Sequence, residues 1–402
     1  MSDHNQDAGA ATGPLAGVRV IDLTSVVMGP SATQIMGDLG ADIIKVEHPT
    51  GDSVRHIGPA RHPDMGPLYL QNNRNKRSVV LDLKSEEGRA ALLALVKEAD
   101  VFTYNIRPQA VSRLKLDYAD ISAVNPGIIY AAAVAYGRGG PDTGRPVYDD
   151  IMQAAAGISG LFARMDGKPR QAPLNICDRV TGLYLTISIV SALYHRALTG
   201  KGQEIEVPML ETMSQFVLGD HMAGAAFVPP LGDIGYMRLL SRHRGPYPTK
   251  DGYICIVVYT DQHWRAFTEL IGDPDLIDRD PNFADQTVRT KNAELCGEYL
   301  ARHMPTRTTE EWLEFCRSID IPAAAVTDLD QIFDHPHLKA VDMFSTMEHP
   351  TEGTVRVARF PVTFSDTPAS IRRLAPRLGE HTEEVLAEVN AAGTNDRTGT
   401  DA

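Results

Sequence analysis

One aspartate, Asp178, stands where a side chain could carry out chemistry. It follows the run LNIC and precedes a long apolar segment, residues 183–194 (LYLTISIVSALY), which predicts a helix beginning close to the aspartate. An aspartate at a helix start usually caps it by accepting backbone N–H bonds. The same position keeps a carboxylate ionised, and apolar neighbours leave it poorly hydrated and more nucleophilic. Both interpretations stay open, because one residue fills both roles only if its two oxygens divide them.

Other polar groups can have either a structural or a functional role. Tyr148, Asp149 and Asp150 precede the helical run QAAAGISGL, where adjacent acids favour capping over catalysis. Four basic side chains flank the run VVLDL at 79–83: Lys84, Arg77, Lys76 and Arg74. They form either a charged rim of the strand or a pocket for phosphates.

Several common motifs are missing or incomplete. The run GRGG at 137–140 leads into Pro141 instead of a helix, and no GxGxxG or GxxxxGK[ST] occurs, which disfavours a nicotinamide enzyme. His335 and His337 lack a third ligand nearby, so we predict no metal site. Neither GxSxG nor HExxH is present, and simple hydrolase motifs are therefore absent.

The elements that must position these residues alternate between strands and helices. Residues 18–23 predict a strand, 31–39 a helix and 43–46 a second strand, which places the loop 24–29 between a strand's carboxyl end and a helix start. Further strands are predicted at 79–83, 101–104, 128–136 and 204–207, with a helix over 85–98. This alternation predicts an α/β fold with a mostly parallel sheet, in which ligands gather at the carboxyl ends of the strands.

Beyond Pro230 the pattern changes. A strand over 253–260 and largely helical text over 262–338 predict a second, smaller α+β domain, and strand-like text resumes at 354–364. We therefore expect a large domain from 14–222 with a C-terminal return at 340–388, a small domain at 230–338, and flexible tails at 1–13 and 389–402.

Composition narrows the classes of function. The 402 residues carry a net charge of -13, which opposes binding to nucleic acid or anionic lipid. The four cysteines lie far apart, and the N-terminal residues contain no apolar signal, so we expect a cytoplasmic protein. The apolar stretch 183–194 is shorter than a membrane span needs, and we predict a buried helix and no membrane association.

A set of motifs in one order resembles the family III CoA-transferases, the formyl-CoA transferase-like group. They are PLAGVRVIDLTSVVMGPSATQIMGDLGADIIKVEHPTGDSVR, NKRSVVLDLK, YNIRP, YDDIMQAAAG, LNICDRVTGLY, TGKGQEIEV, YPTKDGYICI and PRLGEHTEEVL, and they extend over residues 14–387. The resemblance implies a Rossmann-like large domain made from both ends of the chain, and two interlocked subunits in a homodimer. It also implies transfer of coenzyme A from an acyl-CoA to a small free carboxylic acid, with no metal and no permanently bound cofactor.

The resemblance assigns roles to individual residues. The family's essential aspartate matches Asp178, which would form an aspartyl anhydride and then an aspartyl-CoA thioester. The matching contacts to coenzyme A are Val26 and Leu81 beside the adenine, Lys84, Arg113 and His48 at phosphates, and Asn105 and Ile106 beside the pantetheine.

Some positions depart from the family pattern. Val27 replaces a glutamine, and no glycine-rich loop is evident after Pro230, which disfavours formate or oxalate chemistry. Asp149 replaces a glutamate near the reacting centre and has a possible supporting role. The same fold hosts acyl-CoA racemases, which remain the alternative. Tyr148 stands where their histidine would be, and tyrosine is a poor general base at neutral pH, so transfer is preferred.

Overall fold

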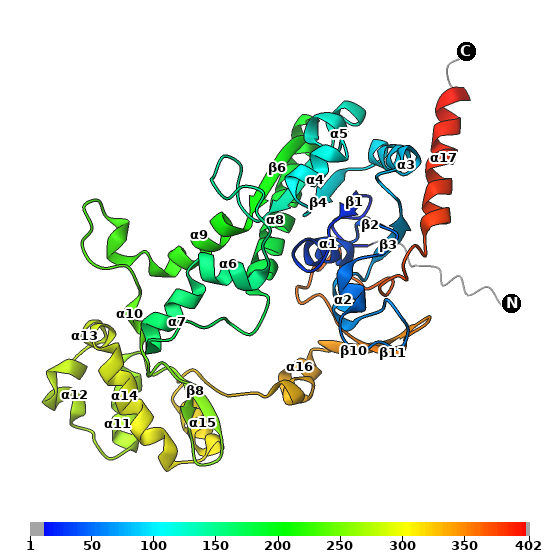
Figure 1. Cartoon of the computed structure of the whole chain (residues 1–402). Coiled ribbons are helices and arrows are strands. Elements are labelled where there is room, and N and C mark those ends of the chain that lie inside the picture. Colours follow the sequence, from blue (N-terminus) through cyan, green and yellow to red (C-terminus); the bar gives the residue numbers. More distant parts are fainter. Residues whose placement is uncertain (1–11, 399–402) are drawn as a thin grey trace. The chain divides into compact units, whose positions relative to one another are not determined.

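The computed structural model describes residues 12–398, and this part of the chain forms two compact units (Figure 1). Unit 1 contains the described residues up to Ala156, Ala172–Gln215 and the described residues from Leu338 onward, and unit 2 contains Gly157–Gln171 and Phe216–His337. Residues 157–171 and 216–222 therefore group with unit 2, although the sequence placed them in the large domain.

Unit 1 is built on a six-stranded sheet in the order β3-β2-β1-β4-β5-β6. All neighbouring strands are parallel, which confirms the predicted α/β class. The strands are β1 (Arg19–Leu23), β2 (Asp42–Glu47), β3 (Lys76–Val80), β4 (Val101–Tyr104), β5 (Ile129–Val134) and β6 (Gln203–Pro208). This order is that of Rossmann-like sheets. Successive strands are added outward from β1 on one side and then, from β4 onward, on the other side. The connections after β1 and β4 therefore diverge and leave a crevice at the carboxyl ends of those two strands.

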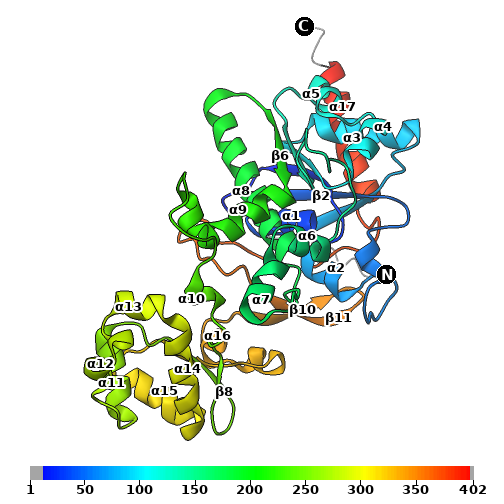
Figure 2. The same ribbon diagram turned by 60° about the vertical axis from the view of Figure 1, so that its left-hand side comes forward.

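Helices cover both faces of this sheet. Residues such as Ile21, Phe102 and Tyr130 form an apolar face under α3 (Glu86–Lys97), α5 (Tyr118–Val124) and α17 (Thr382–Thr398). The opposite face packs against α1 (Met28–Asp38) and α8 (Ile176–Thr199), as Figure 2 shows. The C-terminal helix α17 lies beside α3 and β3, so residues 389–398 continue a helix instead of the predicted tail, while residues 1–11 and 399–402 of the predicted tails lie outside the described residues.

The third strand begins and ends three residues earlier than the run VVLDL suggested, and its two basic residues are buried in ion pairs. The Lys76 ammonium lies 3.1 Å from the Asp22 carboxylate, and Arg77 and Arg74 pair with the carboxylates of Asp42 and Asp38. Three of the four basic side chains predicted as a rim or a phosphate pocket are therefore structural partners within unit 1.

Helix α8 is longer than the apolar run that predicted it, and only one of its faces is buried. At 24 residues, with a mean hydropathy of 1.4 over its most apolar window, it is long and apolar enough to cross a membrane, so the length argument against a span does not hold. Helices in soluble cores pass the same test, and α8 packs on α1, β5 and β6. Its other face is exposed and carries Leu183, Ile187, Val190, Tyr194 and Leu198.

Shorter elements complete unit 1, with α9 and α16 extending into unit 2. They are η1 (Ser53–His56), α2 (Pro67–Asn72), α4 (Pro108–Arg113), α6 (Asp149–Ala155), α9 (Met209–His221), α16 (Pro336–Ala340), and the antiparallel pair β10 (Phe344–His349) and β11 (Gly353–Ala358).

Unit 2 has an aromatic core of its own. Trp264, Phe267, Phe283 and Trp312 pack together beneath a small antiparallel sheet, which fits the predicted α+β class of this part. The strands are β7 (Tyr247–Pro248), β8 (Tyr253–Ile256) and β9 (Ala323–Ala325). The helical elements are α7 (Ile158–Asp166), η2 (Ala223–Ala226), α10 (Met237–Leu240), α11 (Asp261–Leu270), α12 (Leu276–Arg279), η3 (Pro281–Phe283), α13 (Gln286–Lys291), α14 (Ala293–His303), η4 (Met304–Thr306), α15 (Thr309–Ser318) and η5 (Leu329–Asp334).

Candidate active site

Two loops meet at the switch point of the sheet. One follows β1 and contains Ser25 and Val26, and the other follows β4 and contains Asn105 and Ile106. The Asn105 side chain joins them, because its Oδ1 accepts from the Ser25 N–H at 2.9 Å and its Nδ2 donates to the Ser25 carbonyl at 2.8 Å. The predicted Asn105 thus fixes the floor of the crevice where an α/β sheet binds its ligand.

Two adjoining cavities open at this crevice. The larger, of about 680 Å³, is lined by Val26, Asn105, Tyr148 and Asp178, among others. The smaller, of about 360 Å³, is lined by His48, Leu81 and Lys84. Both include Ser25 and Ile106, so the two cavities adjoin at the β1 and β4 loops.

Asp178 lies in the first turn of α8 but does not cap it. The helix is flanked by Asn175 at the N-cap position, and the Asp178 N–H instead donates to Oδ1 of Asp149 at 2.9 Å. The Asp178 carboxylate has no hydrogen-bond partner within residues 12–398, while its side chain lines the larger cavity. The Asp178 side chain therefore does not cap α8, and the Asp149 carboxylate satisfies the Asp178 N–H instead.

Burial perturbs the Asp178 carboxyl group strongly. Loss of hydration, together with the nearby Asp149 carboxylate, raises the pKa of Asp178 from 3.8 to about 7, against the opposing charge of Arg179. The sequence predicted that the helix N-terminus would keep this group ionised, whereas burial and the Asp149 charge raise its pKa into the neutral range, so the protonated form is also populated there. When ionised, a carboxylate with a raised pKa is a stronger nucleophile and a stronger base.

The neighbouring thiol does not compete for the role of nucleophile. Cys177 is buried, and desolvation with the charges of Asp149 and Asp178 raises the pKa of its thiol to about 12. It therefore stays protonated at neutral pH, and a protonated thiol attacks carbonyl carbon poorly.

Asp149 is held in place by a polar contact on its own helix. It is only 5% exposed at the first turn of α6, where its Oδ2 accepts from Nε2 of Gln153 at 2.7 Å. The Gln153 amide also bonds the backbone of Ala172 and Leu174, at 2.8 and 3.1 Å, just before α8 begins. This pair thus anchors the segment that delivers Asp178 to the cavity.

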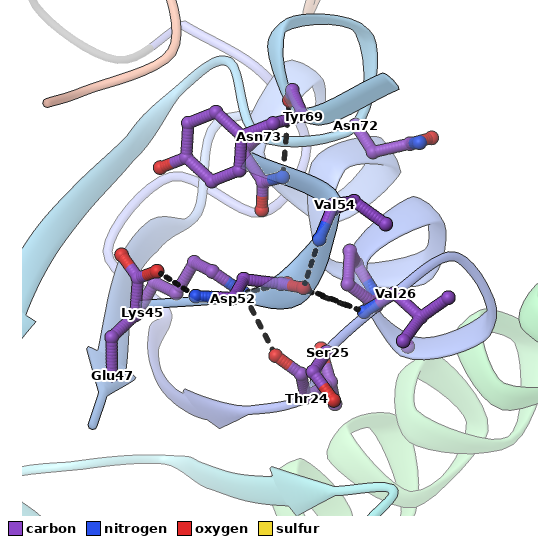
Figure 3. A network of polar contacts seen from close by, with 12 residues as sticks. Thr24, Ser25, Val26, Lys45, Glu47, Asp52, Val54, Tyr69, Asn72 and Asn73 are labelled. Carbon is purple, nitrogen blue, oxygen red and sulfur yellow. Dashed lines mark hydrogen bonds and ion pairs between the residues drawn. The ribbon is translucent and has the colours of Figure 1, made fainter. Parts of the chain in front are cut away.

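A buried ion pair supports the loop after β1 (Figure 3). Val26 has a left-handed backbone (φ 70°), an uncommon conformation for a β-branched residue, and its N–H donates to both Asp52 oxygens at 3.1 and 3.2 Å. The Lys45 ammonium donates to the same carboxylate at 3.1 Å and to the Thr24 carbonyl at 2.8 Å. Because these contacts converge on residues 24–26, they hold the strained loop in the shape that lines the cavities.

The predicted site residues fall into three groups. Val26, Asn105, Ile106, Tyr148 and Asp178 line the larger cavity, while His48, Leu81, Lys84 and Ile106 line the smaller one. The two residues assigned to the adenine thus line different cavities. Arg113, the last residue of α4, is exposed and lines neither cavity, although its neighbour Leu114 lines the smaller one.

The sequence did not single out four residues that the structure brings to the site. Lys45 and Asp52 support the loop from below, and Arg107 and Arg145 line the larger cavity. Arg107 stands in the motif YNIRP next to two residues that were predicted, which is a usable signal. Lys45 and Asp52 carry no such sequence signal, because a lysine within a strand and an aspartate in a turn are ordinary residues until their burial is known.

Metal ligands are not gathered in the described part of the chain. Among residues 12–398, no group of three or more histidine, cysteine, aspartate or glutamate side chains is placed to hold a metal ion.

Comparison with known proteins decides the family. The profile of CoA-transferase family III matches residues 15–382. The chain belongs to this family and is a CoA-transferase. It is 32% identical to a succinate–glutarate CoA-transferase of Agrobacterium fabrum, over 96% of this chain and 98% of that protein. It is also 32% identical to a formyl-CoA:oxalate CoA-transferase of Afipia carboxidovorans, over 93% of each chain.

The fold agrees with this assignment. A crystal structure of a CAIB/BAIF family protein from Brucella suis superposes with a TM-score of 0.79 at 31% identity, covering 94% of this chain and all of that one. The CoA-transferase therefore has the family's fold over nearly its whole length.

Proposed function

We propose that this CoA-transferase moves coenzyme A from an acyl-CoA thioester to a free carboxylic acid through covalent intermediates on Asp178. The observation that carries the proposal is the Asp178 carboxylate, which lacks a hydrogen-bond partner in the described chain and lines the cavity at the switch point. A desolvated, unpaired carboxylate that faces a ligand cavity has the properties of a nucleophile.

The chemistry proceeds by successive acyl substitutions. An Asp178 oxygen attacks the thioester carbonyl carbon, and the C–S bond breaks. The CoA thiolate departs, and the acyl group stays bound to Asp178 as a mixed anhydride. The thiolate then attacks the Asp178 carbonyl carbon, which forms an aspartyl-CoA thioester and releases the donor acid as a carboxylate. The acceptor carboxylate repeats the two steps in reverse and leaves as its CoA thioester, with Asp178 regenerated. Covalent catalysis of this kind divides one difficult substitution into easier ones.

The two cavities suggest how the coenzyme lies. We place its nucleotide end in the smaller cavity, where Lys84 and His48 offer positive or hydrogen-bonding groups to phosphates and Leu81 offers an apolar contact. The pantetheine arm then passes Ile106, which lines both cavities, and brings the thioester toward Asp178.

The acceptor acid is proposed to be a dicarboxylate. The relative from Agrobacterium is named for succinate and glutarate, and the larger cavity of this chain has two arginines on its wall. Arg145 is paired with Asp142 at 2.5 Å, whereas Arg107 has no acidic partner within residues 12–398. The Arg107 guanidinium is therefore available to a second carboxylate.

The transfer reaction tests the role of Asp178 directly. Purified protein is incubated with succinyl-CoA and a panel of mono- and dicarboxylates, and the new CoA esters are separated by chromatography. Asp178→Asn should lower the rate by roughly 1,000-fold or more, as loss of a covalent nucleophile does, and hydroxylamine should trap wild-type Asp178 as a hydroxamate. The matched control is Asp220→Asn, an exposed aspartate on α9. Full activity of Asp178→Asn contradicts the mechanism.

A second variant tests the substrate class. Arg107→Gln should raise KM for a dicarboxylic acceptor about tenfold, the loss of one charge-assisted contact, and leave KM for a monocarboxylic acceptor unchanged. An equal increase for both acids, or an increase only for the CoA ester, assigns Arg107 to the coenzyme and removes this part of the proposal.

We further propose that the CoA-transferase is a homodimer. The support is the exposed stripe on α8, where five large apolar side chains face outward at helical spacing, from Leu183 to Leu198. A contiguous apolar face of this kind marks an interaction surface more often than a solvated one.

A further inference from the structure

Unit 2 contains a cavity of its own, of about 210 Å³. Its wall is formed by β8 and the residues after it, by parts of α10, α11, α13 and α14, and by the loop 241–245. None of these residues takes part in the site at the switch point of unit 1. The cavity is too small for a whole coenzyme and has the size of a small metabolite or ion.

Three arginines, Arg238, Arg244 and Arg289, line the cavity together with the His243 imidazole, and the lining includes no aspartate or glutamate. Of these groups, Arg289 pairs with Asp261, and His243 lies 3.7 Å from Glu294. Arg238 lies over the Tyr259 ring at 5.7 Å, and neither Arg238 nor Arg244 forms an ion pair within residues 12–398. In a chain with a net charge of -13, such a local excess of positive charge favours an anionic ligand.

A second, independent observation concerns the buried side chain of Arg289. It is only 4% exposed, with Nη1 donating to the Phe283 carbonyl at 2.7 Å and Nη2 paired with Asp261. The Nε–H donor is buried as well and has no hydrogen-bond partner among residues 12–398. Burying a donor of a charged group without a partner is unfavourable, so native proteins usually satisfy it with protein, water or ligand.

We infer that this cavity binds a small oxyanion, either a carboxylate or a phosphate group, through the buried Arg289 and the more accessible Arg238 and Arg244. Planar guanidinium groups match both oxyanions in geometry, and the enclosing aromatic and apolar wall strengthens each charge-assisted contact. Trp264 lines the same cavity and is buried. Its fluorescence is therefore a direct reporter of binding, and both tryptophans of the chain, Trp264 and Trp312, lie in unit 2.

The test is a fluorescence titration of the full-length protein with inorganic phosphate and, separately, with succinate. A saturable change with either anion is expected, and the anion that produces it identifies the chemical group bound. The double variant Arg238→Gln/Arg244→Gln should weaken that binding at least tenfold, whereas Arg265→Gln, an exposed arginine of α11 paired with Asp278, should not. Asp178→Asn should also bind normally, which separates this site from the proposed catalytic one.

The outcomes are decisive in either direction. Arg289→Gln should abolish binding, and circular dichroism tells whether that variant is folded. The double variant keeps the test valid if Arg289→Gln unfolds, because Arg244 is exposed and Arg238 is only partly buried. Failure of both anions to give a saturable signal, or unchanged binding in the double variant, overturns the inference and leaves the proposed function untouched.

Discussion

At the scale of single residues, the ionisation of Asp178 should govern the pH dependence of transfer. Because its pKa is raised to about 7 and the reaction needs the carboxylate, kcat/KM should fall about tenfold per pH unit below pH 7 and level off above it. Rates from pH 5.5 to 8.5 with one donor and one acceptor check this. A flat profile across that range contradicts the role of Asp178 as an ionised nucleophile.

The same ionisation should be visible in stability. The native protein holds the Asp178 proton up to about pH 7, whereas the unfolded chain releases it near 3.8, so this group makes the protein less stable as pH rises from about 4 to 7. Asp178→Asn removes the penalty, so it should raise Tm relative to wild type, and more at pH 8 than at pH 5. The corresponding gain in the free energy of unfolding at pH 8 is on the order of a few kcal/mol. Thermal melts at both values measure the difference, and an equal Tm gap at both contradicts it.

The Lys45–Asp52 pair should be essential for the shape of the β1 loop. Both side chains are 1% exposed, so Lys45→Met leaves a buried, unpaired carboxylate and should destabilise the protein by about 3–5 kcal/mol. The released loop should also raise KM for acyl-CoA. Denaturant unfolding and steady-state kinetics measure the two effects, with exposed Lys201→Met as control.

A second substitution tests whether the charge is responsible. Asp52→Asn in the Lys45→Met background should recover part of the lost stability, because it removes the unpaired charge. A double variant no more stable than Lys45→Met would show that packing, and not the ion pair, holds the loop.

At the scale of elements, the contact between α8 and α1 should position Asp178. A Cβ at Gly182 would lie 2.6 Å from Ser31 Oγ and 2.7 Å from the Met28 carbonyl oxygen, so Gly182→Ala must push the start of α8 away from α1. We expect a loss of about 1–3 kcal/mol in stability and at least tenfold in kcat. Gly219→Ala is the matched control, since a Cβ there meets no atom of the described residues within 4 Å.

The alternation of strands and helices could be predicted from the sequence because it depends on residues that are close together in the chain. Residues 101–104 were predicted as a strand and form β4, since apolar β-rich runs bury on both faces of a parallel sheet. The start of β3 was missed, because Lys76 and Arg77 resemble a rim until their partners Asp22 and Asp42, far away in the chain, are brought beside them.

At the scale of the whole molecule, the exposed face of α8 should join two subunits. The side chains of Ile187 and Tyr194 are 62% and 68% exposed, and replacing both with lysine places charges in the middle of the proposed interface. Light scattering should give twice the 43.9 kDa chain mass for wild type and a lower mass for the double variant. Exposed Glu98→Lys should leave the mass unchanged, and a monomeric wild type contradicts the homodimer.

The sequence by itself determined the succession of strands and helices, the family, and the place of Asp178 at a helix start, since periodicity and helix-start residues act over a few positions. Only the tertiary structure decided that Asp149 takes the backbone contact of Asp178, that the pKa of Asp178 rises to about 7, and that Arg289 keeps one donor unsatisfied in a cationic cavity. Burial, cavity walls and charge pairing join residues distant in sequence, and no local pattern records them.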